Sequence, residues 1–189
     1  MKFRRRREGK TNYRKRLALL KSGKIRLVVR RCNNNIIVQF IQYKKEGDNV
    51  VYGAISKKLK NYGWRYHTGN IPSGYLIGLL AGKKAIEKGV KEVVLDLGLQ
   101  TSTKQNVIYS VVKGVIDAGI SVAVSEEMLP DEKRLTGQHI VEYVKVLLKN
   151  NKPLYEKQFS HYVKNNIDPE KIPENFELVK KAIMSGCYG

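Results

Sequence analysis

The stretch KIRLVVRRCNNNIIVQFIQY, residues 24–43, decides the fold because it predicts two paired β-strands. Apolar residues alternate with arginines over residues 25–31, with Val28 as the one break, and residues 36–43 are rich in β-branched and aromatic side chains. The three asparagines at 33–35 lie between these runs, and asparagine tolerates the left-handed backbone that a tight turn requires. The stretch therefore predicts a β-hairpin with an asparagine turn.

The charge of the first predicted strand is unusual. Arg26 and Arg30 are four positions apart and so project from the same strand face, while Arg31 lies at the turn. A row of guanidinium groups on one face favours an anionic partner, to which the neighbouring asparagine amides would add hydrogen bonds. The alternative is the solvated outer face of an ordinary hairpin, and the hairpin alone does not decide between these interpretations.

Length and composition indicate a globular protein of one sizeable domain with appendages. The chain has 189 residues, of which 42% are hydrophobic and 28% charged. No apolar run approaches the ~20 residues that span a bilayer, and the basic start lacks the apolar stretch of a signal peptide. Cys32 and Cys187 show no metal-ligand spacing, which favours a reducing compartment and no structural zinc.

Charge is concentrated near the start of the chain. There are 36 lysines and arginines against 17 acids, and residues 1–31 alone hold 14 of these basic groups and one acid. Such a field favours a polyanion, with nucleic acid as the first candidate and an anionic membrane as the second. Membrane binding needs a broad apolar face, and residues 4–16 offer only Tyr13 as a sizeable apolar group. The sequence therefore predicts a nucleic-acid partner and no membrane.

Residues 1–16 are predicted to form a basic arm. They hold nine basic groups and have almost nothing to bury, so the arm alone should be mobile. A short helix is expected over residues 14–20, with Leu17, Leu19 and Leu20 docking on the body, before Ser22 and Gly23 end it.

Residues 56–71, SKKLKNYGWRYHTGNI, interleave basic and aromatic side chains. Such a loop pairs with phosphates through lysines such as Lys57 and Lys58 and stacks its rings on bases. The alternative is a loop that its aromatic rings pin to the core. That alternative accounts for Trp64 better than for the lysines.

The next segment, PSGYLIGLLAGKKAIEKG at 72–89, predicts a helix with a glycine stripe. Gly74, Gly78 and Gly82 recur every four residues and so line one side. Each costs a helix interior ~1 kcal/mol relative to alanine, so we expect the sheet or a nucleic-acid backbone to pack against them. The segment is no P-loop, because Ile77 and Lys84 stand where that motif needs glycine and serine or threonine.

The order of predicted elements gives an α/β fold, a mixed sheet with helices on its faces. Three meandering strands are followed by a helix, a strand, a second helix and a last strand. The expected elements are a third strand at 49–55, strands at 92–97 and 120–124, a helix at 106–118, and later helices at about 136–149, 155–165 and 173–185. We divide the chain into a basic N-terminal arm (1–24), an α/β RNA-binding core (25–125) and a helical C-terminal appendage (126–189).

Catalysis is not expected. The strand order is that of ribonuclease-H-like domains, whose nucleases bind two metal ions with several acidic residues, one of them on the first strand. Here the first strand carries no acid, Asp96 is the sole strand candidate, and Asp117 lies at a helix end. One carboxylate cannot hold two metals, so Asp96 is expected to cap or pair structurally. The histidines at 67, 139 and 161 lack metal-ligand spacing. We expect no catalytic residue, no metal site and no cofactor.

Four segments resemble a known family in order and spacing: RLVVRRCNNNIIVQ (26–39), YGWRYHTGNIPSGYLIGLLAG (62–82), VVLDLGLQTSTK (93–104) and GVIDAGISVAVSEEMLPDEKRLTGQHI (114–140). The family is the eighteenth family of large-subunit ribosomal proteins, which binds 5S ribosomal RNA, in its archaeal and eukaryotic branch. The resemblance covers nearly the whole chain. Bacterial members lack most of the segment after Ser125, and eukaryotic members add a basic C-terminal extension, so the archaeal type is favoured.

The resemblance implies the translational-machinery variant of the ribonuclease-H-like fold, without catalytic acids. It implies a structural protein of the central protuberance, cytoplasmic within the large subunit, that attaches 5S ribosomal RNA to the large ribosomal RNA beside neighbouring large-subunit ribosomal proteins. No small-molecule substrate is expected. The alternative is an RNA-processing nuclease of the same fold. Cys32 departs from the serine usual in the family, which removes one hydroxyl contact.

The predicted RNA-binding residues come from three segments, most of them carried over by motif and Arg16, Lys57 and Lys58 from the charge pattern. They are Arg4, Arg5, Arg6, Arg7, Lys10, Tyr13, Arg14 and Arg16 in the arm, Arg26, Arg30, Arg31, Asn33, Asn34, Asn35 and Gln39 in the hairpin, and Lys57, Lys58, Trp64, Arg65, Tyr66, His67, Thr68, Gly69 and Asn70 in the loop.

Overall fold

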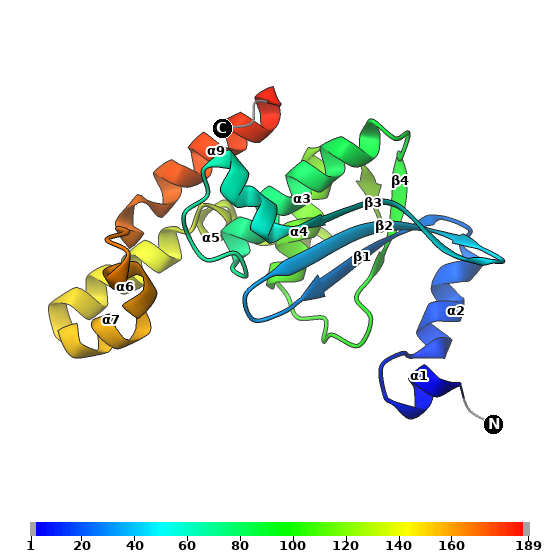
Figure 1. Cartoon of the computed structure of the whole chain (residues 1–189), viewed down its shortest axis with the longest axis horizontal. Helices are drawn as coiled ribbons and strands as arrows, with labels where there is room; N and C mark the ends of the chain where they lie inside the picture. The colour runs from blue at the N-terminus through cyan, green and yellow to red at the C-terminus, as the bar shows by residue number, and fades with distance from the viewer. Residues whose placement is uncertain (1–2, 187–189) are drawn as a thin grey trace.

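The computed structural model describes residues 3–186 (Figure 1), so Lys2 of the arm and Cys187 lie outside the described residues. A five-stranded sheet in the order β3-β2-β1-β4-β5 forms the centre of the molecule. Its strands are β1 (Ile25–Arg31), β2 (Ile36–Lys44), β3 (Gly47–Ile55), β4 (Glu92–Asp96) and β5 (Ser121–Val122). The first three pair antiparallel and β4 joins β1 in parallel, which confirms the predicted mixed sheet and its hairpin.

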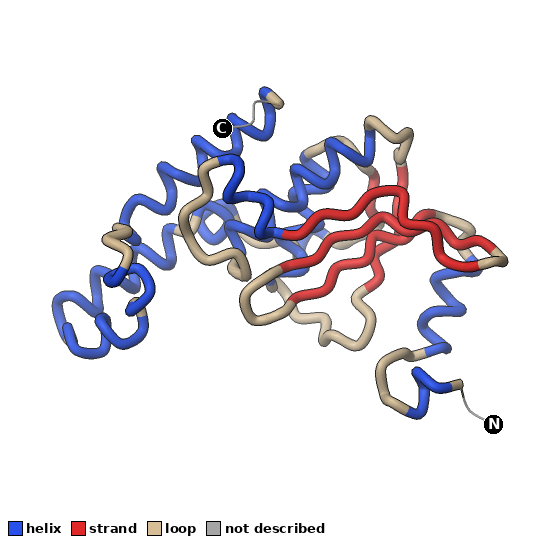
Figure 2. The backbone as a smooth tube through the Cα atoms, viewed as in Figure 1, coloured by secondary structure: helices blue, strands red, loops and turns tan. Residues whose placement is uncertain are grey.

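Alternate side chains along each strand point to opposite faces of the sheet. Leu27 lies opposite Phe40 and Val29 opposite Val38, and these fully buried side chains form the core with helices α3 (Ile71–Ile86) and α4 (Val107–Asp117). The other face carries Arg26, opposite Ile41 in β2, and lies toward the arm (Figures 1 and 2). The arginine row predicted from the sequence therefore lies on the face away from α3 and α4.

The glycine stripe of α3 packs against helix α4, not against the sheet or a nucleic acid as expected. A Cβ added to Gly78 would lie 2.2 Å from the carbonyl oxygen of Val111. The contact is reciprocal, because a Cβ on Gly114 of α4 would lie 2.2 Å from the carbonyl oxygen of Tyr75. The prediction of close packing was right and the predicted partner was wrong. Gly114 supplies the second half of a contact between two helix backbones.

The arm contains α1 (Arg4–Arg7) and α2 (Tyr13–Lys21), and the loop region contains the 3₁₀ helix η1 (Ser56–Tyr62). The side chain of Asn12 caps α2 by accepting from the backbone N–H of Lys15. Leu17 is 57% exposed, so its predicted docking on the body is wrong. Leu19 and Leu20 are half-buried, and Arg16 reaches Asp48 of the sheet.

The C-terminal appendage (126–189) is helical, as predicted, although its boundaries differ. Its elements are η2 (Glu126–Met128), α5 (Glu132–Thr136), α6 (Gln138–Asn150), α7 (Lys152–Gln158), α8 (Ser160–Lys164), η3 (Pro169–Lys171) and α9 (Ile172–Ser185). The helix expected at 155–165 is two helices with a break at Phe159, and the first begins earlier because Pro153 suits a first turn. Within residues 3–186, no helix is long and apolar enough to cross a membrane.

The appendage shares the core of the sheet domain. Phe176 of α9 is 2% exposed, and its ring lies 5.5 Å from that of Tyr75 in α3. Ile172, Val179 and Ile183 of the same helix are equally buried in the main hydrophobic cluster. Helix α9 therefore packs along α3, on the same side of the molecule as the loop that precedes α3 (Figure 1).

Candidate nucleic-acid interface

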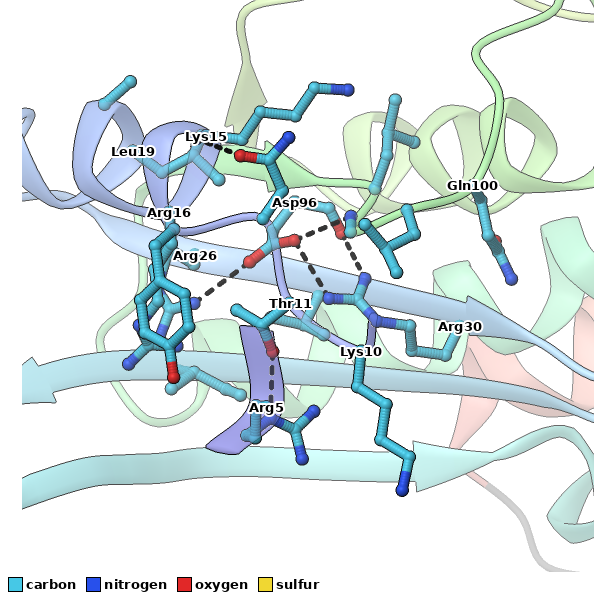
Figure 3. A pocket seen from close by; sticks show the side chains of 18 of the residues that line it. Arg5, Lys10, Thr11, Lys15, Arg16, Leu19, Arg26, Arg30, Asp96 and Gln100 are labelled. Carbon is cyan, nitrogen blue, oxygen red and sulfur yellow. Dashed lines mark hydrogen bonds and ion pairs between the residues drawn. The ribbon is translucent and has the colours of Figure 1, made fainter. Parts of the chain in front are cut away.

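A cleft of about 1310 Å³ lies between the arm and the outer face of the sheet. Figure 3 shows Arg5, Lys10 and Lys15 on its arm side. Its floor includes the aliphatic side chains Val28, Ile41, Leu95 and Leu97 beside several charged groups. A groove with long cationic side chains on one wall and a floor that is partly apolar suits a polyanion with apolar surface. RNA has both features, because it carries phosphates and bases.

An ionic network occupies the floor of this cleft. Arg26 is 2% exposed and donates to the Oδ2 atoms of Asp96 at 3.0 Å and of Asp48 at 2.8 Å. Arg30 donates to Oδ1 of Asp96 at 2.9 Å, and Arg16 of α2 donates to Oδ2 of Asp48 at 2.8 Å (Figure 3). Three guanidinium groups thus share two carboxylates, and Arg16 ties the arm to the sheet.

The network keeps both carboxylates ionised. Burial raises the pKa of Asp96, but hydrogen bonds from Arg30, Gly98 and Arg26 outweigh burial and lower that pKa below 3.8. The same competition between burial and the two arginines lowers the pKa of Asp48. The structural pairing expected of Asp96 is confirmed.

The buried position of Arg26 changes the interpretation of the arginine row. Its guanidinium is neither solvated nor directed at an external anion, because the anionic partners are Asp48 and Asp96 of the same chain. Arg30 is more open, with 37% of its side chain exposed, although it also donates to the Asp96 carbonyl. Arg26 is therefore not among the side chains that we propose to contact RNA. The strand alternation identified its face but not the carboxylates beside it.

The basic groups of the arm are mostly exposed. Arg4 and Lys10 lie 3.6 and 3.0 Å from the carboxylate of Glu8, and Arg5 donates to the hydroxyl of Thr11. Arg6, Arg7 and Arg14 are exposed, whereas Tyr13 is partly buried with its ring 5.0 Å from that of Phe3. Surface ion pairs such as those of Glu8 are weak, so these cations remain available to phosphates.

The loop 63–70 alternates between buried and exposed side chains. Trp64, Tyr66 and Thr68 are 1%, 7% and 8% exposed, whereas Arg65 and His67 project outward. The indole N–H of Trp64 donates to the carbonyl of His67 at 3.2 Å and closes the loop on itself. The aromatic rings therefore pin the loop to the core, and the outward side chains are what it can offer to a partner.

The loop lies directly against the hairpin turn. The hydroxyl of Thr68 donates to the carbonyl of Asn34 at 2.5 Å, and its Oγ1 lies 3.3 Å from Oδ1 of Asn35. A Cβ added to Gly69 would lie 2.7 Å from the carbonyl oxygen of Asn33, so glycine is required by this approach. Two segments of the predicted interface, some thirty residues apart in the sequence, thus form one continuous surface.

Asn70 caps helix α3. Its side chain accepts from the backbone N–H of Ser73 at 3.0 Å, and Ser73 reciprocates at the backbone N–H of Asn70. Its position in the interface is thereby fixed by helix capping, a role that the sequence motif did not reveal.

Together these segments expose a turn–loop surface, which we define as Arg31, Asn33, Asn34, Arg65 and His67. All five are exposed and lie at the end of the β1–β2 hairpin away from the arm (Figure 1). Although His67 is exposed as a residue, its ring is partly desolvated, and this desolvation, the Arg31 charge and His161 lower the pKa of His67 below 6.5. The imidazole is therefore neutral at neutral pH, and Nδ1 accepts from the Gly69 N–H, which leaves the proton on Nε2.

The remaining predicted residues lie between these regions. Gln39 of β2 is half-buried beside Gly53, opposite Val28. Lys57 and Lys58 are exposed on η1, with the Lys58 ammonium 6.0 Å from the centre of the Tyr52 ring. The structure therefore joins the turn to the loop, but it leaves Gln39 and both lysines outside the turn–loop surface.

The sequence interpretation missed Gln100. It lines the cleft, and its side-chain amide donates to the carbonyl of Arg31 at 3.0 Å. Its position four residues after the end of the parallel strand β4 was the available signal, because ligands of α/β sheets bind beyond the carboxyl ends of such strands.

The family comparison covers the segments that form this interface. A model of the family described as ribosomal large subunit proteins 60S L5 and 50S L18 matches residues 1–93. The match runs through the arm, the hairpin, the loop 63–70 and the glycine helix α3, which are the segments that form the cleft wall and the turn–loop surface. Over these 93 of its 189 residues the chain is similar to the ribosomal large subunit proteins 60S L5 and 50S L18, which supports a large-subunit ribosomal protein of that type.

Proposed function

We propose that this protein binds 5S ribosomal RNA and attaches it to the large ribosomal RNA in the central protuberance. The single observation that carries the proposal is the turn–loop surface, in which Thr68 fixes the hairpin turn against the loop 63–70. Cations and amides from two separate segments are thereby held in one fixed arrangement. A fixed arrangement can recognise one folded RNA among many, which a mobile basic tail cannot.

The arm and the turn–loop surface make different kinds of contact with RNA in this proposal. The arm offers long flexible cations and little surface of its own, so its contacts go to phosphates and supply affinity. The turn–loop surface offers Asn33 and Asn34 amides and the neutral His67 imidazole. These groups form hydrogen bonds with base edges and riboses, which distinguish one RNA from another.

We also infer where the protein acts and which type of the family it represents. A protein of this family acts in the ribosome, which is cytoplasmic, and its neighbours there are large-subunit RNA and other ribosomal proteins. We further propose the archaeal type of the family, which is supported by the helical appendage that follows Ser125. We also propose the division into arm (1–24), core (25–125) and appendage (126–189).

The nuclease alternative finds little support in the site. Asp96 is committed to Arg26 and Arg30, and no group of three or more potential metal ligands is found in residues 3–186. Incubation of labelled 5S RNA with the protein and Mg²⁺ or Mn²⁺ should leave the RNA intact. Cleavage that is lost in Asp96→Asn would overturn the scaffold proposal.

Footprinting on total ribosomal RNA tests the proposal directly. The purified protein should protect 5S RNA and one region of the large RNA, and it should bind 5S RNA more tightly than transfer RNA at matched salt. Equal affinity for both RNAs, or protection spread over all the RNA, would contradict the proposal.

A further inference from the structure

The C-terminal appendage contacts the loop 63–70 at three points. The Tyr162 hydroxyl accepts from the backbone N–H of His67 at 3.0 Å. The Tyr66 hydroxyl donates to the carbonyl of Asp168 at 2.8 Å, and the side-chain amide of Asn175 donates to the carbonyl of Gly63 at 3.1 Å. The three hydrogen bonds therefore hold the loop at His67, Tyr66 and Gly63.

Aromatic packing supports the same contact. The Tyr66 ring lies edge-on between Trp64, with ring centres 5.4 Å apart, and Tyr162, with ring centres 5.8 Å apart. The Tyr162 ring in turn lies 5.9 Å from that of Phe159. Edge-on pairs of this kind contribute ~0.5–1.5 kcal/mol beyond simple burial. The loop is thus held between the sheet domain on one side and the appendage on the other.

The appendage itself has a poor composition for binding RNA. Residues 126–189 hold ten basic and ten acidic groups, whereas residues 1–125 hold 26 basic groups against seven acids. The groups that touch the loop are two neutral side chains, Tyr162 and Asn175, and the backbone carbonyl of Asp168. A phosphate-binding role would call for an excess of cations.

We propose that Tyr162 is a positioning residue that sets RNA selectivity without touching RNA. By holding the backbone of His67, it fixes where Arg65 and His67 project beside the hairpin turn, and Asn175 does the same at Gly63. Preorganised groups bind a matching partner better because less ordering remains to be done on binding. The inference rests on the proposed recognition of 5S RNA and adds that the neutral appendage sets its accuracy.

Tyr162→Phe tests the inference, because it removes the hydroxyl and keeps the ring beside Tyr66. The preference for 5S RNA over transfer RNA should fall about threefold to tenfold, the range that a single hydrogen bond supports. The slope of log affinity against log salt should stay as in the wild type, because no phosphate contact is lost. Amide exchange at His67 should become faster.

Tyr143→Phe is the matched control. Its hydroxyl donates to Gln158 within the appendage, at 2.9 Å, so the variant loses one tyrosine hydrogen bond away from the loop. It should keep the wild-type preference. Thermal melting of both variants separates a change in selectivity from general instability, and Asn175→Ala repeats the test at Gly63 if Tyr162→Phe folds poorly.

The outcomes separate the inference from the function on which it rests. A wild-type protein that does not prefer 5S RNA refutes the proposed function. A wild-type protein that prefers it, with Tyr162→Phe and Asn175→Ala both keeping that preference, refutes the positioning role alone. Equal weakening for both RNAs would also refute it, since a merely structural defect acts on every RNA.

Discussion

Residues 1–125 and residues 126–189 share one hydrophobic core but differ in surface charge. The first region carries all of the net charge of +19, and the second carries none. The first presents the arm, the cleft and the turn–loop surface, whereas the second contacts the loop 63–70 through neutral side chains and backbone. The difference indicates that affinity and geometry are supplied by different parts of the same folded unit.

Deletion of residues 1–16 should have the largest effect, because it tests the charged region where the charge is densest. If about half of its nine basic groups engage phosphates, the slope of log affinity against log salt should flatten by roughly 3–4 units. Titration against 5S RNA at several salt concentrations measures this. Replacement of Lys145, Lys149, Lys152 and Lys157 of the appendage by glutamine should leave the slope unchanged. If both variants flattened the slope equally, the appendage would contribute phosphate contacts as the arm does, and the contrast between the two regions would be wrong.

Gly78→Leu tests whether residues 1–125 and residues 126–189 unfold together. The added side chain meets the Val111 carbonyl, which is backbone and cannot move aside, so unfolding free energy should fall by about 3 kcal/mol or more. Because α9 packs on α3, thermal melting should show one transition at a lower temperature. A second, unshifted transition would show that the appendage melts independently. Val146→Leu, at a position 52% exposed on α6, is the control that should change little.

Asp96→Asn tests the ionic floor of the charged region. It leaves Arg26 buried with one partner fewer, which should lower the unfolding free energy by about 3 kcal/mol at pH 7. The lowered pKa of Asp96 means that its contribution is complete above pH 3.8 and is lost as the pH falls through the folded pKa. The difference between the variant and the wild type in urea unfolding should therefore shrink as the pH falls below 3.8.

The exposed pair Lys24–Glu92 provides the control for this prediction. Glu92→Gln should cost no more than about 1 kcal/mol, as surface pairs do. A cost for Asp96→Asn as small as that for Glu92→Gln would show that the buried network contributes little to stability.

The double variant Asn33→Ala, Asn34→Ala should have the smallest effect and sharpens the division of roles. It removes two exposed amides but keeps the Asn34 carbonyl that Thr68 bonds. The preference for 5S RNA over transfer RNA should fall about tenfold, or ~1.4 kcal/mol, while the salt slope scarcely moves. If arm deletion instead abolished the preference and left the slope intact, the two roles would be reversed.

The sequence predicted the fold well because periodicity reports on secondary structure and on faces. The strand alternation over 25–31, the asparagine turn and the glycine spacing all correspond to elements in the structure. What periodicity cannot report is the partner opposite each face. Arg26 was placed on the correct face, yet Asp48 and Asp96 lie beside it.

The candidate site was predicted less completely than the fold, for the same physical reason. Trp64, Tyr66 and Thr68 have the residue types of an RNA-binding loop, but alternate positions of an extended segment face opposite ways. Tyr66 packs on Tyr162 and donates to the carbonyl of Asp168, both of which come from a distant part of the chain. No local pattern in the loop specifies those partners.

The three contacts between the appendage and the loop join residues 95, 102 and 112 positions apart in the sequence. A chain made from its N-terminus exposes the basic arm and the hairpin long before residues 162–175 are synthesised. During that interval the nascent protein already attracts any polyanion, but its selective surface is unfinished. The order of synthesis thus places indiscriminate binding first and discrimination last, so newly made molecules depend on early completion or on temporary shielding to avoid the wrong RNA.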